Sequence, residues 1–312
     1  MSALPWVTHV ERYLALRRAM GFELGIAGRQ LLQFARFAHA ARATALTIDL
    51  ALAWASAASA PTPLTRARRI ELVRPFARYL QQVDPATEVP ERGVFGRAHQ
   101  RLAPHILAPA EISDLLAAAA RLPPAEGLRP FAYQTLFGLL AATGLRLGEA
   151  LRLELQDVDL AAGMLTIRRT KFRKSRWVAM HCTTVAHLAC YLDQRRGGLP
   201  ATDRVFVGSR GRAISVGMAD YVFKKLREEL GWQPRGAHRA VRIYDLRHTF
   251  ITRRLASWQA QGTDIDHAML ALSTYVGHAK VTDTYWYLTA TPELMQTASG
   301  RFEQFAKGGG HD

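Results

Sequence analysis

The sequence predicts a mainly α-helical protein with one small antiparallel β-sheet. Apolar residues recur three and four residues apart along most of the 312 residues, which is the spacing of amphipathic helices. Strand-like sequence is confined to about residues 154–180. Between residues 86 and 108, proline, glycine and arginine interrupt the helical pattern. We therefore expect an all-α N-terminal domain over residues 1–85, a basic linker over residues 86–108 and an α+β domain over residues 109–312.

Four helices are expected in the N-terminal domain, over residues 7–20, 27–41, 48–57 and 64–83. The first ends at Gly21, and Pro61 and Pro63 break the chain before the fourth. Pro75 lies inside the fourth helix, where a proline can introduce a kink. This helix also carries a row of arginines, which suits either a solvated face or contact with a phosphate backbone.

The charge of the chain predicts a polyanionic partner. Lys and Arg number 41 against 26 Asp and Glu, which gives a formal net charge of +15. Cationic side chains that neutralise phosphates release counterions, and this release drives association with nucleic acid. Double-stranded DNA is therefore the expected partner. The arginines of the fourth helix and the linker that we expect to contact it are Arg66, Arg69, Arg92, Arg97 and Arg101.

Membrane and metal sites are not expected. No apolar run approaches the roughly 20 residues that span a bilayer, and the N-terminus lacks the order of a signal peptide. We therefore expect a cytoplasmic protein. Cys182 and Cys190 are too few for a disulfide framework, and their spacing is not that of a zinc ribbon. His181 and His187 lie close by, but we expect thiols rather than a metal site here.

Helical spacing returns at Pro109 and is then interrupted by strand-like sequence. It resumes after about Thr183 and ends with an amphipathic segment over residues 292–307. The interruption consists of two short apolar strands around a polar tip, which predicts a β-hairpin. Two of the six lysines of the chain lie at this tip. The strands are residues 164–167 and 176–179, and the tip is residues 170–175.

Three short motifs carry polar side chains suited to phosphodiester chemistry. They are Thr143-Gly144-Leu145-Arg146 with Glu149 beyond it, Tyr244-Asp245-Leu246-Arg247-His248, and Gly277-His278 with Tyr287 nine residues later. A planar guanidinium donates two hydrogen bonds to phosphate oxygens and keeps its charge at any working pH. A phenolic oxygen can attack phosphorus and form a covalent intermediate. Two arginines, a histidine and a tyrosine brought together would therefore suit DNA cleavage.

This order of motifs resembles the tyrosine recombinase family, also called phage-integrase type, over essentially the whole chain. A lone Thr-Gly-x-Arg or Gly-His is a weak signal, whereas the complete order with a hairpin lysine is specific. The resemblance implies that residues 1–85 form the core-binding domain of the family and residues 109–312 its catalytic domain. The catalytic positions that it implies are Arg146, Lys171, Tyr244, Arg247, His278 and Tyr287.

The resemblance also implies a role for each of these residues. The two arginines hold the non-bridging oxygens of the scissile phosphate, and Lys171, or alternatively Lys174, protonates the departing 5′ oxygen. His278 hydrogen-bonds the phosphate or helps to order the nucleophile. Tyr287 forms a 3′-phosphotyrosine, so neither metal nor ATP is required. Supporting residues are Glu149 and His248, and DNA contacts at the hairpin tip are Arg173 and Lys174.

Two assignments stay open. Tyr244 stands where the family usually has a histidine, and a phenol, with a pKa of about 10, accepts a proton poorly at neutral pH. We expect Tyr244 to donate a hydrogen bond in the site, while the general base is undecided, with His248 as a candidate. Tyr285 lies two residues before Tyr287, and on a helix these phenols point about 200° apart. Only one can face the arginines, and we expect it to be Tyr287.

The resemblance implies a site-specific recombinase, integrase or transposase of a mobile element. It would act without cofactor as a homotetramer on paired DNA sites, alone or with other recombinases. Residues 292–307 would then dock on a neighbouring protomer, or pack on their own protomer. Two alternatives are a type IB topoisomerase-like DNA-relaxing enzyme and a catalytically silent DNA-binding regulator. The DNA target and the direction of the reaction are not predicted.

Overall fold

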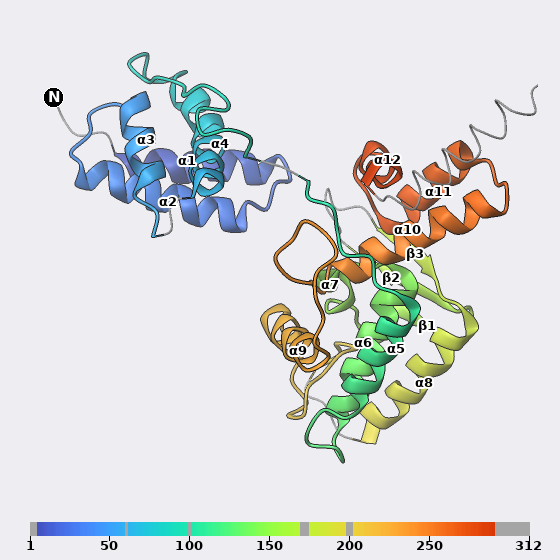
Figure 1. The fold of residues 1–312 in the computed structure, drawn as a ribbon. Helices are drawn as coiled ribbons and strands as arrows, with labels where there is room; N and C mark the ends of the chain where they lie inside the picture. The colour runs from blue at the N-terminus through green and yellow to red at the C-terminus, as the bar shows by residue number, and fades with distance from the viewer. Residues whose placement is uncertain (1–4, 60–61, 99–100, 169–174, 198–201, 291–312) are drawn as a thin grey trace, which may run out of the picture. The chain divides into compact units, whose positions relative to one another are not determined.

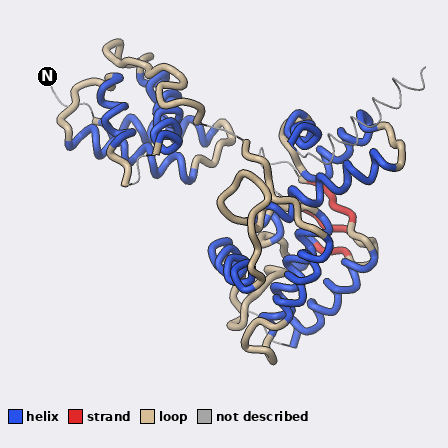
Figure 2. Tube along the Cα trace, viewed as in Figure 1, coloured by secondary structure: helices blue, strands red, loops and turns tan. Residues whose placement is uncertain are grey.

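The computed structural model describes residues 5–59, 62–98, 101–168, 175–197 and 202–290. Its contacts divide the chain into two compact units, Met1–Arg101 and Leu102–Asp312, here called the N-terminal and C-terminal units (Figure 1). Helices dominate both units, and the described strands all lie in the C-terminal unit (Figure 2). The predicted fold class, mainly α with a small antiparallel sheet, is confirmed.

The helices of the N-terminal unit are α1 (Trp6–Ala19), α2 (Gly25–Ala40), α3 (Ile48–Ser56) and α4 (Pro63–Leu80). They confirm the four predicted helices. Thr47 and Thr62 cap α3 and α4, because each side-chain oxygen accepts a hydrogen bond from the first turn. The core closes around Phe34, whose ring meets those of Trp54 and Phe76 edge-on at centroid distances of 5.3 and 6.4 Å.

The described residues between 81 and 108 form neither helix nor strand, yet they are packed. In the N-terminal unit, Phe95 lies against the aromatic core. In the C-terminal unit, Leu107 is fully buried and its backbone N–H donates to the hydroxyl of Thr249 at 2.9 Å. The carbonyl of Ala103 accepts from the backbone of Ala237 at 2.9 Å. The predicted linker therefore packs on one unit at its start and on the other at its end.

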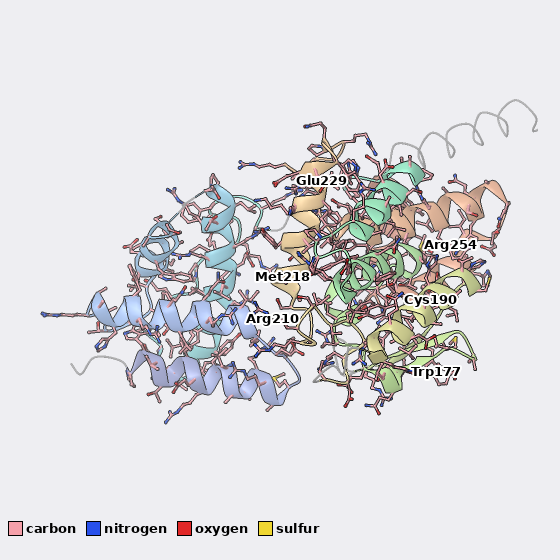
Figure 3. All side chains as sticks on the ribbon, turned by 90° about the horizontal axis from the view of Figure 1, so that it is seen from below. Trp177, Cys190, Arg210, Met218, Glu229 and Arg254 are labelled. Atoms are coloured by element: carbon pink, nitrogen blue, oxygen red, sulfur yellow. The ribbon has the colours of Figure 1, made fainter. Side chains whose placement is uncertain are left out.

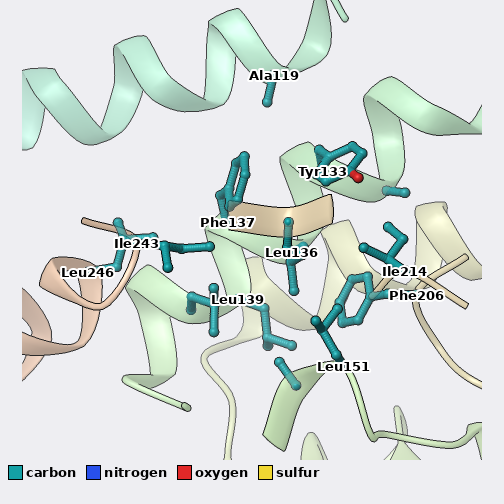
Figure 4. Close-up of a cluster of buried hydrophobic side chains, with 14 of the residues drawn as sticks. Ala119, Tyr133, Leu136, Phe137, Leu139, Leu151, Phe206, Ile214, Ile243 and Leu246 are labelled. Carbon is teal, nitrogen blue, oxygen red and sulfur yellow. The ribbon is translucent and has the colours of Figure 1, made fainter. Parts of the chain in front are cut away.

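Helix α6 (Leu128–Thr143) is the centre of the larger core of the C-terminal unit. Tyr133, Leu136 and Phe137 are buried along it (Figure 4). Phe137 also meets Phe223 edge-on at 5.7 Å. The helices around it include α5 (Pro109–Ala120), α8 (Cys182–Gly197) and α9 (Val216–Glu229), and the short α7 (Leu147–Ala150) follows α6 in the chain.

A three-stranded antiparallel sheet has the order β1-β2-β3, with β1 (Val158–Asp159), β2 (Met164–Ile167) and β3 (Arg176–Ala179). A 3-10 turn, η1 (Leu155–Asp157), leads into it. The pairing of Ile167 with Arg176 is the last described pair before the tip, so the predicted hairpin is confirmed. Leu165 and Val178 are buried, whereas Trp177 is 74% exposed on the other face (labelled in Figure 3). The tip itself, residues 169–174, lies outside the described residues.

The last described helices are α10 (Asp245–Ala260), α11 (Ile265–Val276) and α12 (Thr282–Ala290). They enclose a second, smaller core, in which Ile251, Leu255 and Met269 are fully buried. Tyr287 belongs to the same cluster. The predicted amphipathic segment over residues 292–307 lies outside the described residues. In the described part of the chain, no helix is both long and apolar enough to span a bilayer.

Candidate active site

Arg146 is presented by a turn that only glycine fits. Helix α6 ends at Gly144, which has a φ of +63°. A Cβ at Gly144 would lie 2.5 Å from a ring carbon of Phe250, so a side chain is excluded by space as well as by backbone conformation. The chain then extends, and Arg146 becomes the N-cap of α7. The Thr-Gly-x-Arg motif is therefore a sharp turn between two helices.

Two bonds direct the guanidinium of Arg146. It donates to Oε1 of Glu149 at 2.7 Å and to the carbonyl of Gly277 at 2.8 Å. Burial alone would raise the pKa of Glu149, but hydrogen bonds and charges from Arg176 and Arg146 outweigh it and lower the pKa to about 2. The carboxylate is therefore ionised at neutral pH. Arg146 keeps a third of its side chain exposed, so it is open to a ligand.

Arg247 is the buried member of the arginine pair. Only 1% of it is exposed, and it donates to the carbonyls of Gly144 at 2.7 Å and Val276 at 2.8 Å. Burial and the charge of Arg146 lower the pKa of Arg247, yet a guanidinium stays protonated at neutral pH. Among the described residues its Nε–H has no hydrogen-bond partner. Arg146 and Arg247 thus bind adjacent carbonyls at the end of α11, which brings the first two motifs to the third.

Tyr287 lies at this junction. It is 3% exposed, and its hydroxyl oxygen lies 2.8 Å from Nδ1 of His248. The ring of His278 stacks on that of Tyr287 with an interplanar angle of 11° and a centroid distance of 6.3 Å. Nδ1 of His278 lies 2.6 Å from the hydroxyl of Thr284 on α12. The half-buried Tyr285 packs against the small core.

His248 is held in its neutral form. Burial, together with the charges of Arg242 and Arg247, lowers the pKa of His248 to about 3. The imidazole is therefore uncharged at neutral pH and retains one nitrogen that can accept a proton. Tyr244 covers it, with ring centroids 4.9 Å apart and the planes nearly perpendicular. Tyr244 is 40% exposed.

The remaining predicted site residues belong to the N-terminal unit, the predicted linker and the hairpin tip. Arg69 donates to the carbonyl of Trp54 at 2.6 Å and lies over its ring, and Arg66 lies over the ring of Phe95, so both are engaged inside the N-terminal unit. Exposed arginines of the predicted linker are Arg92, Arg97 and Arg101. The hairpin residues Lys171, Arg173 and Lys174 lie outside the described residues. Within the described ranges, no group of three His, Cys, Asp or Glu side chains could hold a metal ion.

Sequence reasoning missed two residues of the site. Arg176 binds Glu149, and Thr284 binds His278. Thr284 could have been suspected because it lies between His278 and Tyr287 in the sequence. Arg176 was read only as part of a strand. The signal that could have pointed to Arg176 is a charged residue at the start of an otherwise apolar strand, close to a hairpin tip that carries two lysines.

Comparison with known proteins identifies the family. The model of the phage integrase family matches residues 105–293. The chain is 40% identical over 301 residues to y4rB of Sinorhizobium fredii, and the match covers 95% of this chain and 96% of that protein. It is 36% identical over 299 residues to y4rE of the same organism, and that match covers 94% of each chain. Both relatives are named as integrase/recombinase. Among solved structures, the fold is similar to that of the XerH site-specific recombinase bound to a palindromic difH substrate in a post-cleavage complex. The TM-score is 0.65 at 18% identity, and the match covers 89% of this chain and 79% of the XerH chain. This likeness shows the fold. The chain therefore belongs to the phage integrase family of tyrosine recombinases.

Proposed function

We propose that this protein is a site-specific DNA recombinase, the integrase or transposase of a mobile element, that works through a 3′-phosphotyrosine. The observation that carries the proposal is the position of Tyr287, whose hydroxyl lies 2.8 Å from His248, the sequence neighbour of the buried Arg247. A nucleophile, a proton acceptor and a fixed cation are thereby adjacent. The relatives named as integrase/recombinase support the same function.

In the proposed reaction the oxygen of Tyr287 attacks the scissile phosphorus as the bond to the 5′ oxygen breaks. The phenolic proton passes to His248, and the departing 5′ oxygen takes a proton from Lys171. Arg146 and Arg247 stabilise the charge that builds on the non-bridging oxygens, because both are oriented before DNA arrives. Attack by a 5′ hydroxyl on the phosphotyrosine reverses these steps and restores a phosphodiester, so religation requires no ATP.

The role of His248 as proton acceptor gives a specific expectation. His248→Gln keeps a polar side chain of similar reach but cannot take the proton, so cleavage should slow by about 100-fold. Tyr244→Phe, the matched change in the neighbouring ring, removes only a proposed hydrogen bond to the phosphate and should slow cleavage by about tenfold. Single-turnover cleavage of a nicked duplex measures both rates, with DNA affinity as the control for binding.

A larger loss in Tyr244→Phe than in His248→Gln would contradict the role of His248 as proton acceptor. If His248→Gln cleaves at the wild-type rate, His248 does not take the proton. If Tyr244→Phe retains full activity, Tyr244 is not a donor in the site. The imidazole is uncharged at neutral pH and can therefore accept a proton, although the low pKa that burial gives His248 also makes it a weak base.

Duplex DNA is the proposed partner. The net charge of +15 and the exposed Arg92 and Arg97 favour a polyanion, and the XerH relative was crystallised on its difH DNA. We further propose a homotetramer on two DNA sites, in which residues 292–307 dock on a neighbouring protomer. Strand exchange needs such a pairing, because each cleaved end is passed to a 5′ hydroxyl of another duplex.

The proposal is tested with nicked suicide duplexes taken from the ends of the genetic element that encodes the protein. The wild-type protein, incubated with them in EDTA, should form a covalent protein–DNA band on a denaturing gel. Tight binding without any covalent band would favour the silent DNA-binding regulator. Relaxation of supercoiled plasmid by monomers, without preference for these ends, would favour the topoisomerase-like enzyme. A magnesium requirement for cleavage would contradict the metal-free chemistry.

A further inference from the structure

Arg176, the first residue of β3, makes contacts that strand pairing does not require. Its side chain is 10% exposed. Nη2 and Nη1 donate to the two carboxylate oxygens of Glu149 at 2.8 and 3.2 Å, and Nε donates to the carbonyl of Tyr275 at 2.8 Å. A two-pronged pair of this kind fixes the direction of both partners as well as their distance.

The carboxylate of Glu149 is shared between two guanidiniums. Nη1 of Arg146 donates to Oε1 at 2.7 Å, and the backbone N–H of Arg146 donates to Oε2 at 3.1 Å. Glu149 is 3% exposed, so water screens this charge poorly. With Arg176 present, the three side chains carry one net positive charge. Without Arg176, the carboxylate would neutralise Arg146 alone, and the positive charge offered to a phosphate would fall.

Gly277 lies between the same two guanidiniums. Its carbonyl accepts from Arg146, and a Cβ on it would lie 2.6 Å from Nη1 of Arg176. Its φ of +71° also favours glycine. The turn that leads to His278 is therefore built to let Arg176 approach. A guanidinium that served only to stabilise a strand would not need this opening.

We propose that Arg176 is a positioning residue for strand cleavage, which offsets the charge of Glu149 so that Arg146 offers an uncompensated, directed guanidinium to the scissile phosphate. This inference rests on the proposed function. Arg176 also pairs with Ile167 in the last described pair before the hairpin tip, so it links the hairpin that bears Lys171 to the arginine site.

The test compares Arg176→Met with the double variant Arg176→Met/Glu149→Gln in single-turnover cleavage of a suicide duplex. Methionine retains the length of the stem but no charge, so Arg176→Met should slow cleavage by about 100-fold. The amide at position 149 in the double variant still accepts a hydrogen bond from Arg146 but no longer neutralises its charge. The double variant should therefore cleave about tenfold faster than Arg176→Met. Rates are compared per folded molecule, with the folded fraction taken from thermal unfolding.

Arg195→Met is the matched control. Arg195 is a buried arginine of the same unit that donates to the carbonyls of Thr202 and Arg204. Its loss should lower stability but leave cleavage per folded molecule unchanged. A double variant that cleaves no faster than Arg176→Met would overturn the role in charge compensation. Absence of a covalent band with the wild-type protein would instead contradict the proposed function, so the two failures are distinguishable.

Discussion

Tyr287→Phe is expected to abolish the covalent protein–DNA product. The change removes one oxygen atom, and that atom is the proposed nucleophile beside His248. The ring is buried and keeps its packing in phenylalanine, so folding and DNA affinity should be retained. Denaturing gels of suicide-duplex reactions measure the product, and band-shift titrations measure the affinity.

Tyr285→Phe is the matched control, because it deletes the same atom from the same helix two residues away. Tyr285 packs with the small core, and cleavage should stay close to the wild-type rate. A covalent band that persists in Tyr287→Phe and disappears in Tyr285→Phe would reverse the assignment.

Arg247→Gln is expected to slow cleavage by about 1000-fold or more, since it removes a fixed cation from beside the proposed position of the reacting phosphate. Arg247→Lys should be nearly as impaired. An ammonium is a single point charge and cannot donate to the carbonyls of Gly144 and Val276 with the same fork geometry. Single-turnover rates at saturating DNA separate this effect from weaker binding.

Stability must be measured in parallel, because either change removes the guanidinium that donates to two buried carbonyls. Arg254→Gln is the control on the same helix, at an exposed position whose guanidinium lies about 6 Å from the rings of Phe250 and Trp258 (Arg254 is labelled in Figure 3). It should cleave like the wild-type protein. Wild-type cleavage by folded Arg247→Gln would exclude Arg247 from the chemistry.

Local sequence patterns predicted most of the fold. The four N-terminal helices and the hairpin strands were strongly periodic, and the structure has them within a few residues of the expected bounds. The structure of residues 86–108 was harder to predict from the sequence. Proline and glycine indicate irregular backbone, but they do not reveal whether it packs. The backbone N–H of Leu107 donates to Thr249, which lies 142 residues away in the sequence.

The site was predicted less completely, for a similar reason. The motifs named the residues that the structure gathers around Tyr287, because each motif is short and local. Which carbonyls hold the two arginines could not be read, since Arg146 reaches Gly277 across 131 positions. Arg176 was missed because its partner Glu149 lies 27 positions away, and an arginine in a hairpin is ordinarily a solvated side chain. The catalytic roles stay predictions until they are measured.

Peptide mapping of the trapped complex shows directly whether Tyr287 carries the DNA. After nuclease and trypsin digestion, both candidate tyrosines fall in one peptide, residues 281–301, between Lys280 and Arg301. Fragment ions of this peptide separate position 285 from position 287. We expect a nucleotide phosphate on Tyr287, and its attachment to Tyr285, or to a residue outside this peptide, would contradict the role of Tyr287 as nucleophile.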